Sequence, residues 1–360
     1  MSGRPRSSST RSGPSAAVAS SASAPVCTHV TRNPALPSAV RSSEPITTSS
    51  STTRMLSGVM MLRLRPTPGH RPGTLEGVSQ IAPHPGVPRA LELAEGWVAV
   101  HDTAASSDVA AAGDVLLVPG FTGSKEDFAP ILGGLSAAGF RTVSMDLPGQ
   151  HESPGPADRS AYAVEMLAMA VLAVAGAVTD RPVHLLGHSF GGLVCRAAAI
   201  AAPERLRSLV LLGSGPSAIG GVRAERLRTL RPVLEIGGMP AVYAAMEQYD
   251  RLDPRYDVTS PELADFLRRR FLASSSHGLR GMGDALSSEP DRVAELRATG
   301  LPVLVAYGEG DDAWPPQVQA DMAARLGARC AVISGAMHSP AIERTQQTVD
   351  VLTEFWRRCR

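Results

Sequence analysis

The sequence predicts an α/β fold with a mostly parallel sheet and helices on both of its faces. Three observations support this class. From about residue 86, short apolar runs alternate with longer segments of helical periodicity, which is typical of a parallel sheet covered on both sides. Residues 187–191, Gly-His-Ser-Phe-Gly, join an apolar run to a helix-forming stretch. A long segment without strand pattern, but with apolar residues at helical spacing, interrupts the alternation before residue 302.

The composition fits one large core with an insertion. The chain has 360 residues, of which 43% are hydrophobic, and α/β proteins of this size commonly form one core. The net charge of +1, with acidic and basic residues interspersed, makes nucleic acid an unexpected partner. All but one of the 35 basic residues are arginine, the exception being Lys125. This bias suggests a GC-rich coding sequence of the actinobacterial type.

Residues 1–75 are expected to be a disordered or mis-annotated N-terminal extension. They are rich in Ser, Thr, Pro and Arg, and Glu44 is their only acidic residue, so they cannot bury enough apolar surface to fold alone. An organellar transit peptide is the alternative, although no sustained amphipathic helix is visible. We expect a shorter natural product that starts at Met55, Met60 or Met61 to lose no structure.

The chain is expected to be cytoplasmic and to lack a membrane span. Its four cysteines, Cys27, Cys195, Cys330 and Cys359, show neither metal-ligand spacing nor a dense disulfide framework, which favours a reducing compartment. The apolar run 161–178 is rich in alanine, contains Glu165 and lies between two predicted strands. It is therefore interpreted as a helix that covers the sheet.

The core is expected over residues 86–221 and 301–358, with a helical lid over 222–300 between them. The predicted strands are 97–101, 114–118, 141–145, 183–186, 209–212, 302–307 and 329–333. The predicted core helices are 127–138, where Ser124 and Asp127 fit a capping box, and 161–178, 318–326 and 342–356. In the lid, helices are expected over 223–234, 241–249 and 261–272. Such an insert would lie above the carboxyl ends of the strands, where open α/β sheets bind ligands.

The segment 187–191 is interpreted as a nucleophile elbow. A serine at the centre of this pattern lies on a strained turn from strand to helix, and the flanking glycines allow the turn. Ser189 would then be exposed above the sheet. The amide of Phe190 would lie at the start of the helix, where unpaired N–H groups can bind a developing oxyanion.

A serine becomes a strong nucleophile only with a base and an orienting acid. Both follow in the chain. The turn after the strand 302–307 carries Glu309, Asp311 and Asp312, and His338 follows the strand 329–333. All these residues are expected at the edge of the sheet where Ser189 lies.

Serine, acid and histidine in this order are typical of α/β hydrolases, and over residues 86–358 the chain resembles a serine-nucleophile, esterase- or lipase-like member of that family. The resemblance implies an eight-stranded type of sheet with the lid after strand 6. It assigns Ser189 as nucleophile, His338 as base, and Asp311 as the acid, because the acid commonly lies three residues after a glycine at the strand end. Asp312 remains the alternative, and Glu309 is interpreted as a solvated turn residue.

The resemblance also implies that Phe121 supplies the second amide of the oxyanion hole. Its loop reads Pro119-Gly120 where many relatives have His-Gly, which leaves the amide of Phe121 in place. His188 is interpreted as a packing or hydrogen-bonding residue and His151 as a loop residue that could touch substrate. No cofactor and no metal are expected, because no residues have metal-ligand spacing and a serine triad needs neither.

These features predict a serine hydrolase that cleaves an ester, thioester or amide bond of a small-molecule acyl substrate through an acyl-enzyme. The alternative uses the same triad for C–C bond hydrolysis or cofactor-free haloperoxidase chemistry. A non-catalytic ligand-binding protein is the third hypothesis. Epoxide hydrolases and haloalkane dehalogenases of this fold are excluded because they have aspartate where this chain has Ser189.

Overall fold

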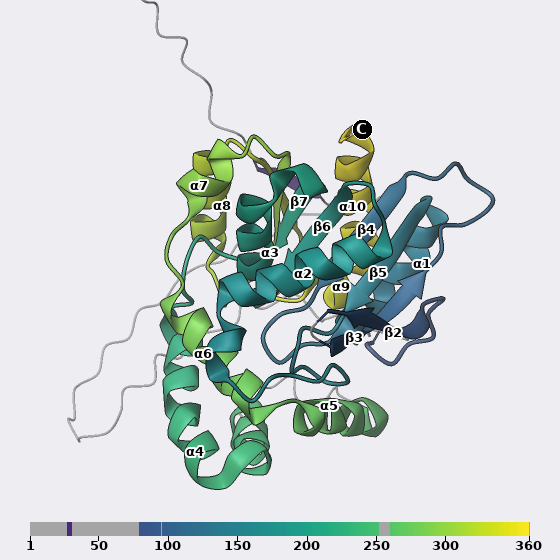
Figure 1. Ribbon diagram of the computed structural model, residues 1–360. Coiled ribbons are helices and arrows are strands. Elements are labelled where there is room, and N and C mark those ends of the chain that lie inside the picture. Colours follow the sequence, from purple (N-terminus) through teal and green to yellow (C-terminus); the bar gives the residue numbers. More distant parts are fainter. Residues whose placement is uncertain (1–26, 31–78, 95, 252–259, 360) are drawn as a thin grey trace, which may run out of the picture.

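The computed structural model describes residues 27–30, 79–94, 96–251 and 260–359 (Figure 1). Within these residues nine strands form one sheet, in the order β1-β9-β8-β7-β6-β4-β5-β3-β2. Their bounds are Thr28–Val30 (β1), Val87–Leu93 (β2), Gly96–Thr103 (β3), Gly113–Val118 (β4), Phe140–Met145 (β5), Val183–His188 (β6), Leu206–Leu212 (β7), Val303–Gly308 (β8) and Arg329–Ile333 (β9). Strand β3 pairs antiparallel with β2 and β5, and all other pairs are parallel. The predicted class is confirmed.

Helices cover both faces of the sheet, as the buried pattern of the strands requires (Figure 1). On one face lie α2 (Val164–Val178), α3 (Phe190–Ala201), α7 (Val293–Ala298) and α8 (Pro316–Leu326). On the other face lie α1 (Ala129–Ala137), α9 (Pro340–Glu343) and α10 (Thr345–Arg358). In β7, Leu209 and Leu211 join the first core, whereas Val210 and Leu212 join the second. The alternation of side chains along a strand therefore supplies both cores.

Three short 3-10 helices complete the core. They are η1 (Lys125–Phe128), η2 (Arg159–Tyr162) and η3 (Pro203–Arg205). Helix η1 begins after Ser124, whose amide donates to the Asp127 carboxylate at 3.2 Å, as the predicted capping box requires. The predicted helix 127–138 is thus a 3-10 turn followed by α1.

The cap consists of α4 (Gly221–Asp250), α5 (Pro261–Ala273) and α6 (Ser276–Ser288), which lie together beyond one end of the sheet (Figure 1). Helix α4 combines the predicted helices 223–234 and 241–249, with a kink at Gly238, where φ is 64°. The sequence did not reveal α6, which is rich in glycine and serine, residues with weak helix propensity. Helix α7 lies inside the predicted lid range but packs against α3 and α8 of the core.

Strand β1 differs from the expectation for residues 1–75, because it adds to the edge of the sheet in parallel with β9. Cys27, directly before it, forms a disulfide with Cys330 of β9. The open edge of β9 supplies hydrogen-bonding groups that this segment lacks on its own. The cysteine pattern consequently no longer supports a reducing compartment, and a chain starting at Met61 would lose β1. The other residues of 1–75 lie outside the described residues.

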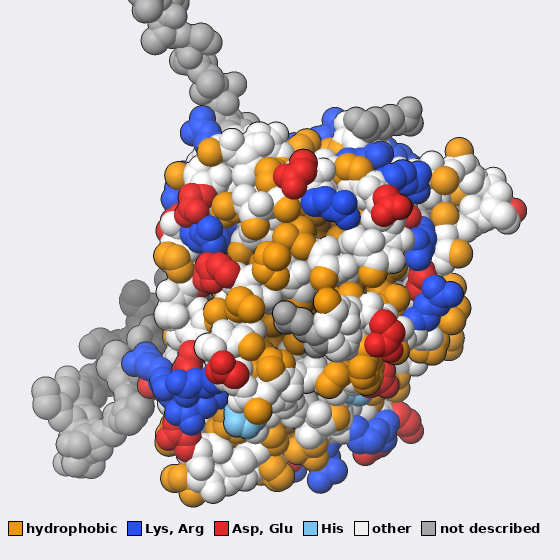
Figure 2. All heavy atoms as spheres, viewed as in Figure 1, with side chains coloured by type: hydrophobic (Ala, Val, Ile, Leu, Met, Phe, Trp, Pro, Cys, Tyr) orange, Lys and Arg blue, Asp and Glu red, His pale blue; other side chains and the backbone are white. Residues whose placement is uncertain are grey.

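Helix α2, which forms most of the apolar run 161–178, packs on the sheet with Leu167 and Val171 buried. In the described ranges, no helix is long and apolar enough to cross a bilayer. On the face seen in Figure 2, basic and acidic side chains are interspersed.

Candidate active site

Ser189 lies on a tight turn between β6 and α3, where its backbone has φ of 54° and ψ of −121°. A non-glycine residue with positive φ is strained and persists only where the surroundings hold it. Here the Ser189 amide donates to the Leu212 carbonyl of β7 at 2.9 Å. A Cβ atom at Gly187 would meet the backbone of Gly191, so the turn also needs a glycine there. The backbone at this turn therefore has the tight strand-to-helix geometry that the pattern 187–191 predicts.

The structure brings Ser189, His338 and Asp311 together from three different strand ends. The Ser189 Oγ lies 2.9 Å from His338 Nε2, and His338 Nδ1 lies 2.9 Å from Asp311 Oδ1. Asp311 follows β8 and His338 follows β9. All three residues are buried, with exposed fractions of 6%, 8% and 4% for Ser189, His338 and Asp311. This chain of hydrogen bonds can move a proton from the serine to the imidazole.

Asp311 stays ionised although it is buried. Burial alone would raise the pKa of its carboxyl, but the hydrogen bond and charge of His338 and the amide of Ala313 hold that pKa below its usual range. Gln319 of α8 adds a hydrogen bond of 2.9 Å to the other oxygen, Oδ2. A carboxylate in this position stabilises an imidazolium when the histidine accepts a proton.

The neighbouring carboxylates are used elsewhere. Asp312 lies half exposed and forms an ion pair of 2.7 Å with Arg223 of the cap. Glu309 accepts a hydrogen bond from the Gly335 amide at 3.0 Å. Of the three carboxylates that the sequence offers, Asp311 is therefore the one that contacts His338.

Two amides lie beside the serine. Phe190 is the first residue of α3, so its N–H has no partner within the helix, and Phe121 lies in the loop between β4 and η1. Neither amide donates a hydrogen bond within the described segments. Gly120 packs against the serine, since a Cβ atom there would lie 3.0 Å from the Ser189 Cβ. The geometry leaves both N–H groups available to an oxyanion.

A cavity of about 1130 Å³ lies between the strand ends and the cap. Ser189, His338 and Phe121 line its floor. On its cap side, α4 and α6 contribute apolar residues: Val222, Leu227, Leu230, Leu234, Val242, Met246, Leu279 and Leu286. The cap also contributes six arginines and one aspartate to the lining: Arg223, Arg226, Arg228, Arg231, Arg270, Arg280 and Asp284. The volume is slightly above the usual range for small-molecule sites, so the cavity can hold a substrate of substantial size.

The two other histidines near the site are not bases for Ser189. His188 Nε2 lies 2.8 Å from the His338 carbonyl oxygen, and burial lowers its pKa to about 4, with the nearby His338 adding to the effect. His188 is therefore neutral at physiological pH. The His151 ring packs edge-on against Phe266 of α5, with ring centroids 5.9 Å apart, outside the residues that line the cavity.

Glu126, His151 and Glu152 place three potential metal ligands close together. However, the Lys125 ammonium lies 2.9 Å from Glu126 Oε1 and 2.7 Å from Glu152 Oε2. Burial alone would lower the Lys125 pKa, but the charges of Asp146 and Glu126 raise it, so the ammonium keeps its proton. Lys125 is the cation of this cluster, and a metal ion would have to displace it.

Sequence reasoning missed the residues that support the site. Gln319 holds Asp311, and Lys125 and Gln150 join the loops beside Ser189. Lys125 has one signal in the sequence, its status as the only lysine of the chain, although codon bias alone accounts for that status. Glutamine has no comparable signal, because its role depends on which backbone group it meets.

Comparison with known proteins supports the fold and a hydrolytic activity. A model of the alpha/beta hydrolase family matches residues 115–351. The pimeloyl-[acyl-carrier protein] methyl ester esterase of Aeromonas hydrophila is 29% identical over 231 residues, which cover 61% of this chain and 86% of that protein. The comparisons do not support the actinobacterial origin that the arginine bias suggests.

Solved esterase structures share the architecture. A structure from work on carboxylesterases of Nitrososphaera gargenis has a TM-score of 0.62 and 21% identity, covering 75% of this chain and 98% of its own. A thermophilic esterase from Thermogutta terrifontis has a TM-score of 0.61 and 22% identity, covering 76% and 99%. At these identities the likeness concerns the fold.

Proposed function

The chain belongs to the alpha/beta hydrolase family and is an esterase-like enzyme, and we propose that it cleaves a carboxylic ester through an acyl-enzyme on Ser189. The observation that carries the proposal is the hydrogen-bonded chain from Ser189 through His338 to Asp311, with both distances at 2.9 Å. Esters are favoured because a relative at 29% identity is named as a methyl ester esterase.

In the first half of the reaction, Ser189 Oγ attacks the carbonyl carbon of the ester while His338 Nε2 takes the hydroxyl proton. Asp311 accepts the hydrogen bond from Nδ1 and stabilises the imidazolium. The carbonyl oxygen becomes an oxyanion, which the amides of Phe121 and Phe190 stabilise. The tetrahedral intermediate then collapses, and His338 gives its proton to the departing alcohol.

In the second half, water attacks the acyl-enzyme. His338 takes a proton from the water, a second oxyanion forms in the same place, and collapse releases the carboxylic acid and restores the Ser189 hydroxyl. Every proton that His338 accepts is returned, so the histidine is restored at the end of each cycle.

The cavity guides the choice of substrate. The apolar side chains of α4 and α6 face Ser189 across a space that exceeds what an acetyl group needs. Burial of each additional methylene group contributes about 0.8 kcal/mol of binding. We therefore propose a small-molecule ester with an extended apolar portion, and we expect kcat/KM to rise from acetate to octanoate.

The test is hydrolysis of p-nitrophenyl acetate, butyrate and octanoate by the full chain. Ser189→Ala and His338→Ala should each lower kcat by roughly 10⁴-fold or more. A fluorophosphonate should add to Ser189, as read by peptide mass spectrometry. Ser208→Ala is the matched control, because this buried serine of β7 contacts His184 and lies away from the cavity.

Labelling that persists in Ser189→Ala would overturn the assignment of the nucleophile. Labelling of Ser189 without turnover of any ester would instead favour a non-catalytic ligand-binding protein. Loss of labelling in Ser208→Ala would show that the assay reports on folding rather than on the nucleophile.

A further inference from the structure

Gln150 lies next to the loop that carries the proposed oxyanion donor. It follows β5, is 2% exposed, and donates from Nε2 to the Gly120 carbonyl oxygen at 2.8 Å. The Gly123 amide donates to the same oxygen at 3.0 Å. The carbonyl of Gly120 therefore accepts two hydrogen bonds, one of them from a distant part of the chain.

The Gly120 carbonyl and the Phe121 amide belong to the same peptide group. A peptide group is planar and, in its trans form, its C=O and N–H point in opposite directions. No cis peptide bond occurs among the described residues. A hydrogen bond that fixes the oxygen of Gly120 therefore also fixes the direction of the Phe121 N–H, on the side away from Gln150.

The same hydrogen bonds strengthen the donor. Hydrogen bonds that run through a peptide group polarise it, so a carbonyl that accepts two of them makes its N–H a better donor. The Phe121 N–H has no acceptor of its own within the described part of the chain. Its capacity as a donor is thus kept for the oxyanion.

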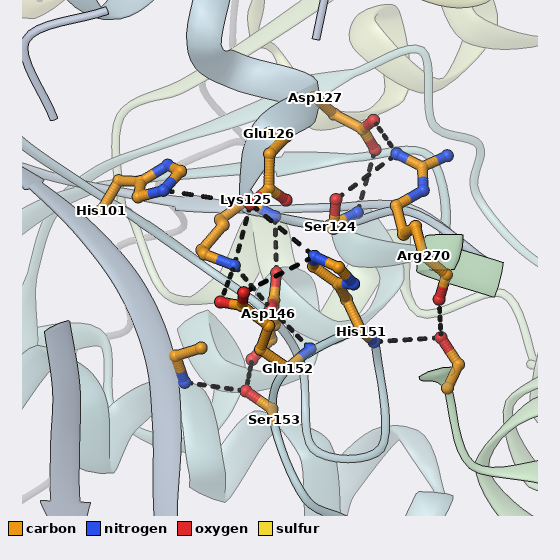
Figure 3. Close-up of polar contacts among 12 residues, drawn as sticks. His101, Ser124, Lys125, Glu126, Asp127, Asp146, His151, Glu152, Ser153 and Arg270 are labelled. Atoms are coloured by element: carbon orange, nitrogen blue, oxygen red, sulfur yellow. Dashed lines mark hydrogen bonds and ion pairs between the residues drawn. The ribbon is translucent and has the colours of Figure 1, made fainter. Parts of the chain in front are cut away.

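Gln150 is itself held in place. Its side-chain Oε1 accepts a hydrogen bond from the main-chain N–H of Leu147 at 3.3 Å, and the main-chain N–H of Gln150 donates to the Leu147 carbonyl oxygen at 2.9 Å. The loop begins at the fully buried Asp146, whose carboxylate accepts from the main-chain amide of Lys125 at 2.7 Å and from its ammonium at 3.1 Å (Figure 3). The Glu152 amide adds a third hydrogen bond to Asp146, at 3.2 Å.

Two loops are thus joined at two points. We define the oxyanion loop as residues 119–124 and the β5 loop as residues 146–153. Lys125, directly after the oxyanion loop, bonds Asp146 at the start of the β5 loop, and Gln150 in the β5 loop bonds Gly120. The Lys125 ammonium contacts the carboxyl groups of Asp146, Glu126 and Glu152, which converge here (Figure 3).

We propose that Gln150 is a positioning residue that aims and polarises the Phe121 amide toward the oxyanion, with the Lys125–Asp146 pair holding its loop in register. This inference rests on the proposed function. The Gln150 side chain does not line the cavity, and it would act on the transition state through the Phe121 amide.

The central variant is Gln150→Met, which keeps the length of the side chain and removes its N–H and C=O groups. With p-nitrophenyl butyrate, kcat should fall about 10- to 100-fold, less than the roughly 100- to 1000-fold loss typical for removal of a complete donor. KM should change less than twofold, because the ground-state ester makes little use of the oxyanion hole.

A trifluoromethyl ketone separates this role from a structural one. It forms a hemiketal with the serine, and its oxyanion requires the same amides, whereas the corresponding alcohol binds without an oxyanion. In Gln150→Met the Ki of the ketone should rise by the factor by which kcat falls, and the Ki of the alcohol should stay unchanged. A fall in kcat without a rise in the Ki of the ketone would overturn the proposal.

Two further variants control the experiment. Ser153→Ala removes a buried serine of the same β5 loop that bonds the Ala99 amide and the Asp146 carbonyl but not Gly120, so kcat should stay within about threefold. Gln150→Glu keeps the shape, and only its protonated carboxyl can donate to the Gly120 oxygen. Its kcat relative to the natural protein should therefore rise as pH falls from 8 to 5.

If Gln150→Met fails to fold, the test is the ratio of kcat in Gln150→Glu to kcat in the natural protein. A ratio that does not change with pH would contradict the proposal. An equal loss of kcat in Ser153→Ala would show that general loosening of the β5 loop is the cause. Fluorophosphonate labelling of Ser189 together with full activity in Gln150→Met would overturn this inference alone, while absence of labelling in the natural protein would overturn the proposed function.

Discussion

At the scale of single residues, the site depends on strain and on burial that the rest of the molecule supports. Ser189 adopts a positive φ that costs of order 1–3 kcal/mol. Its hydrogen bond to β7 and the close contact of α3 with the loop after β4 hold this conformation, since a Cβ atom at Gly191 would meet the Pro119 carbonyl oxygen. The proposed nucleophile is therefore fixed before any substrate binds.

The first prediction at this scale separates the two adjacent aspartates. Asp311→Asn should lower kcat by about 10³- to 10⁴-fold, because an amide cannot stabilise the imidazolium of His338. Asp312→Asn should change kcat less than threefold, because Asp312 pairs with Arg223 rather than with the histidine. Steady-state kinetics with p-nitrophenyl butyrate measure both, and a larger loss in Asp312→Asn would make that residue the acid.

At the scale of elements, one ion pair joins the cap to the start of η1. Arg270 of α5 lies 2.6 Å from Asp127, and both side chains are mostly buried, with exposed fractions of 12% and 14%. Asp127 also accepts from the Ser124 amide, directly after the oxyanion loop. Helix α5 is thus attached to the core close to the loop that carries the proposed oxyanion donor Phe121.

Arg270→Met should therefore destabilise the protein. Loss of a largely buried, charge-assisted hydrogen bond costs about 1.5–3 kcal/mol. Arg269→Met is the matched control, because Arg269 is exposed and pairs with Asp265 within the same helix, where such pairs contribute about 0.3–0.5 kcal/mol. Guanidinium denaturation measures both free energies of unfolding, and equal losses would show that Arg270 does not anchor the cap.

His184 makes strand β6 sensitive to acid. It is buried between Phe140 and Trp356, and burial lowers its pKa to about 3. In the unfolded chain a histidine titrates near 6.5, so between pH 6.5 and 3 the unfolded state binds a proton that the folded state excludes. The free energy of unfolding is then lost as pH falls through this window.

His184→Gln should reduce this dependence whatever it does to the absolute stability. Between pH 5.5 and 4 the slope of the free energy of unfolding should become shallower by about 1.4 kcal/mol per pH unit, which corresponds to one proton. Urea denaturation across this range gives the slope. An unchanged slope would mean that His184 takes up its proton in the folded protein.

At the scale of the whole molecule, the Cys27–Cys330 disulfide closes a loop with a sequence separation of 303. Cross-links over long loops reduce the entropy of the unfolded chain, typically by an amount worth 2–4 kcal/mol. Cys27→Ser should therefore lower the melting temperature, while Cys359→Ser, which removes a free thiol, should leave it nearly unchanged.

Thiol counting tests the pairing itself. In denaturant without reductant, two thiols should react with Ellman's reagent, those of Cys195 and Cys359, and reduction should raise the number to four. Four reactive thiols before reduction would contradict the disulfide. The melting temperature of Cys27→Ser would then report on β1 alone.

Much of the fold was predictable because its signals are local. Each predicted core strand from 97–101 onward appears in the sheet, since a buried strand needs a short apolar run wherever it lies in the chain. Strand β2, which contains polar and exposed positions, gave no such signal. Strand β1 has only three residues and is defined by its pairing with β9, which lies at the other end of the chain.

By itself, the sequence determined the class of fold and pointed to the turn at Ser189, to His338 as the candidate base and to a short set of candidate acids, because strand patterns and turn glycines act over a few residues. Only the tertiary structure decided that Asp311 rather than Asp312 meets His338, that Gln150 bonds Gly120, and that the one lysine contacts three carboxylates. These choices depend on which side chain points at a partner far away in the chain. Packing of the whole chain sets those directions.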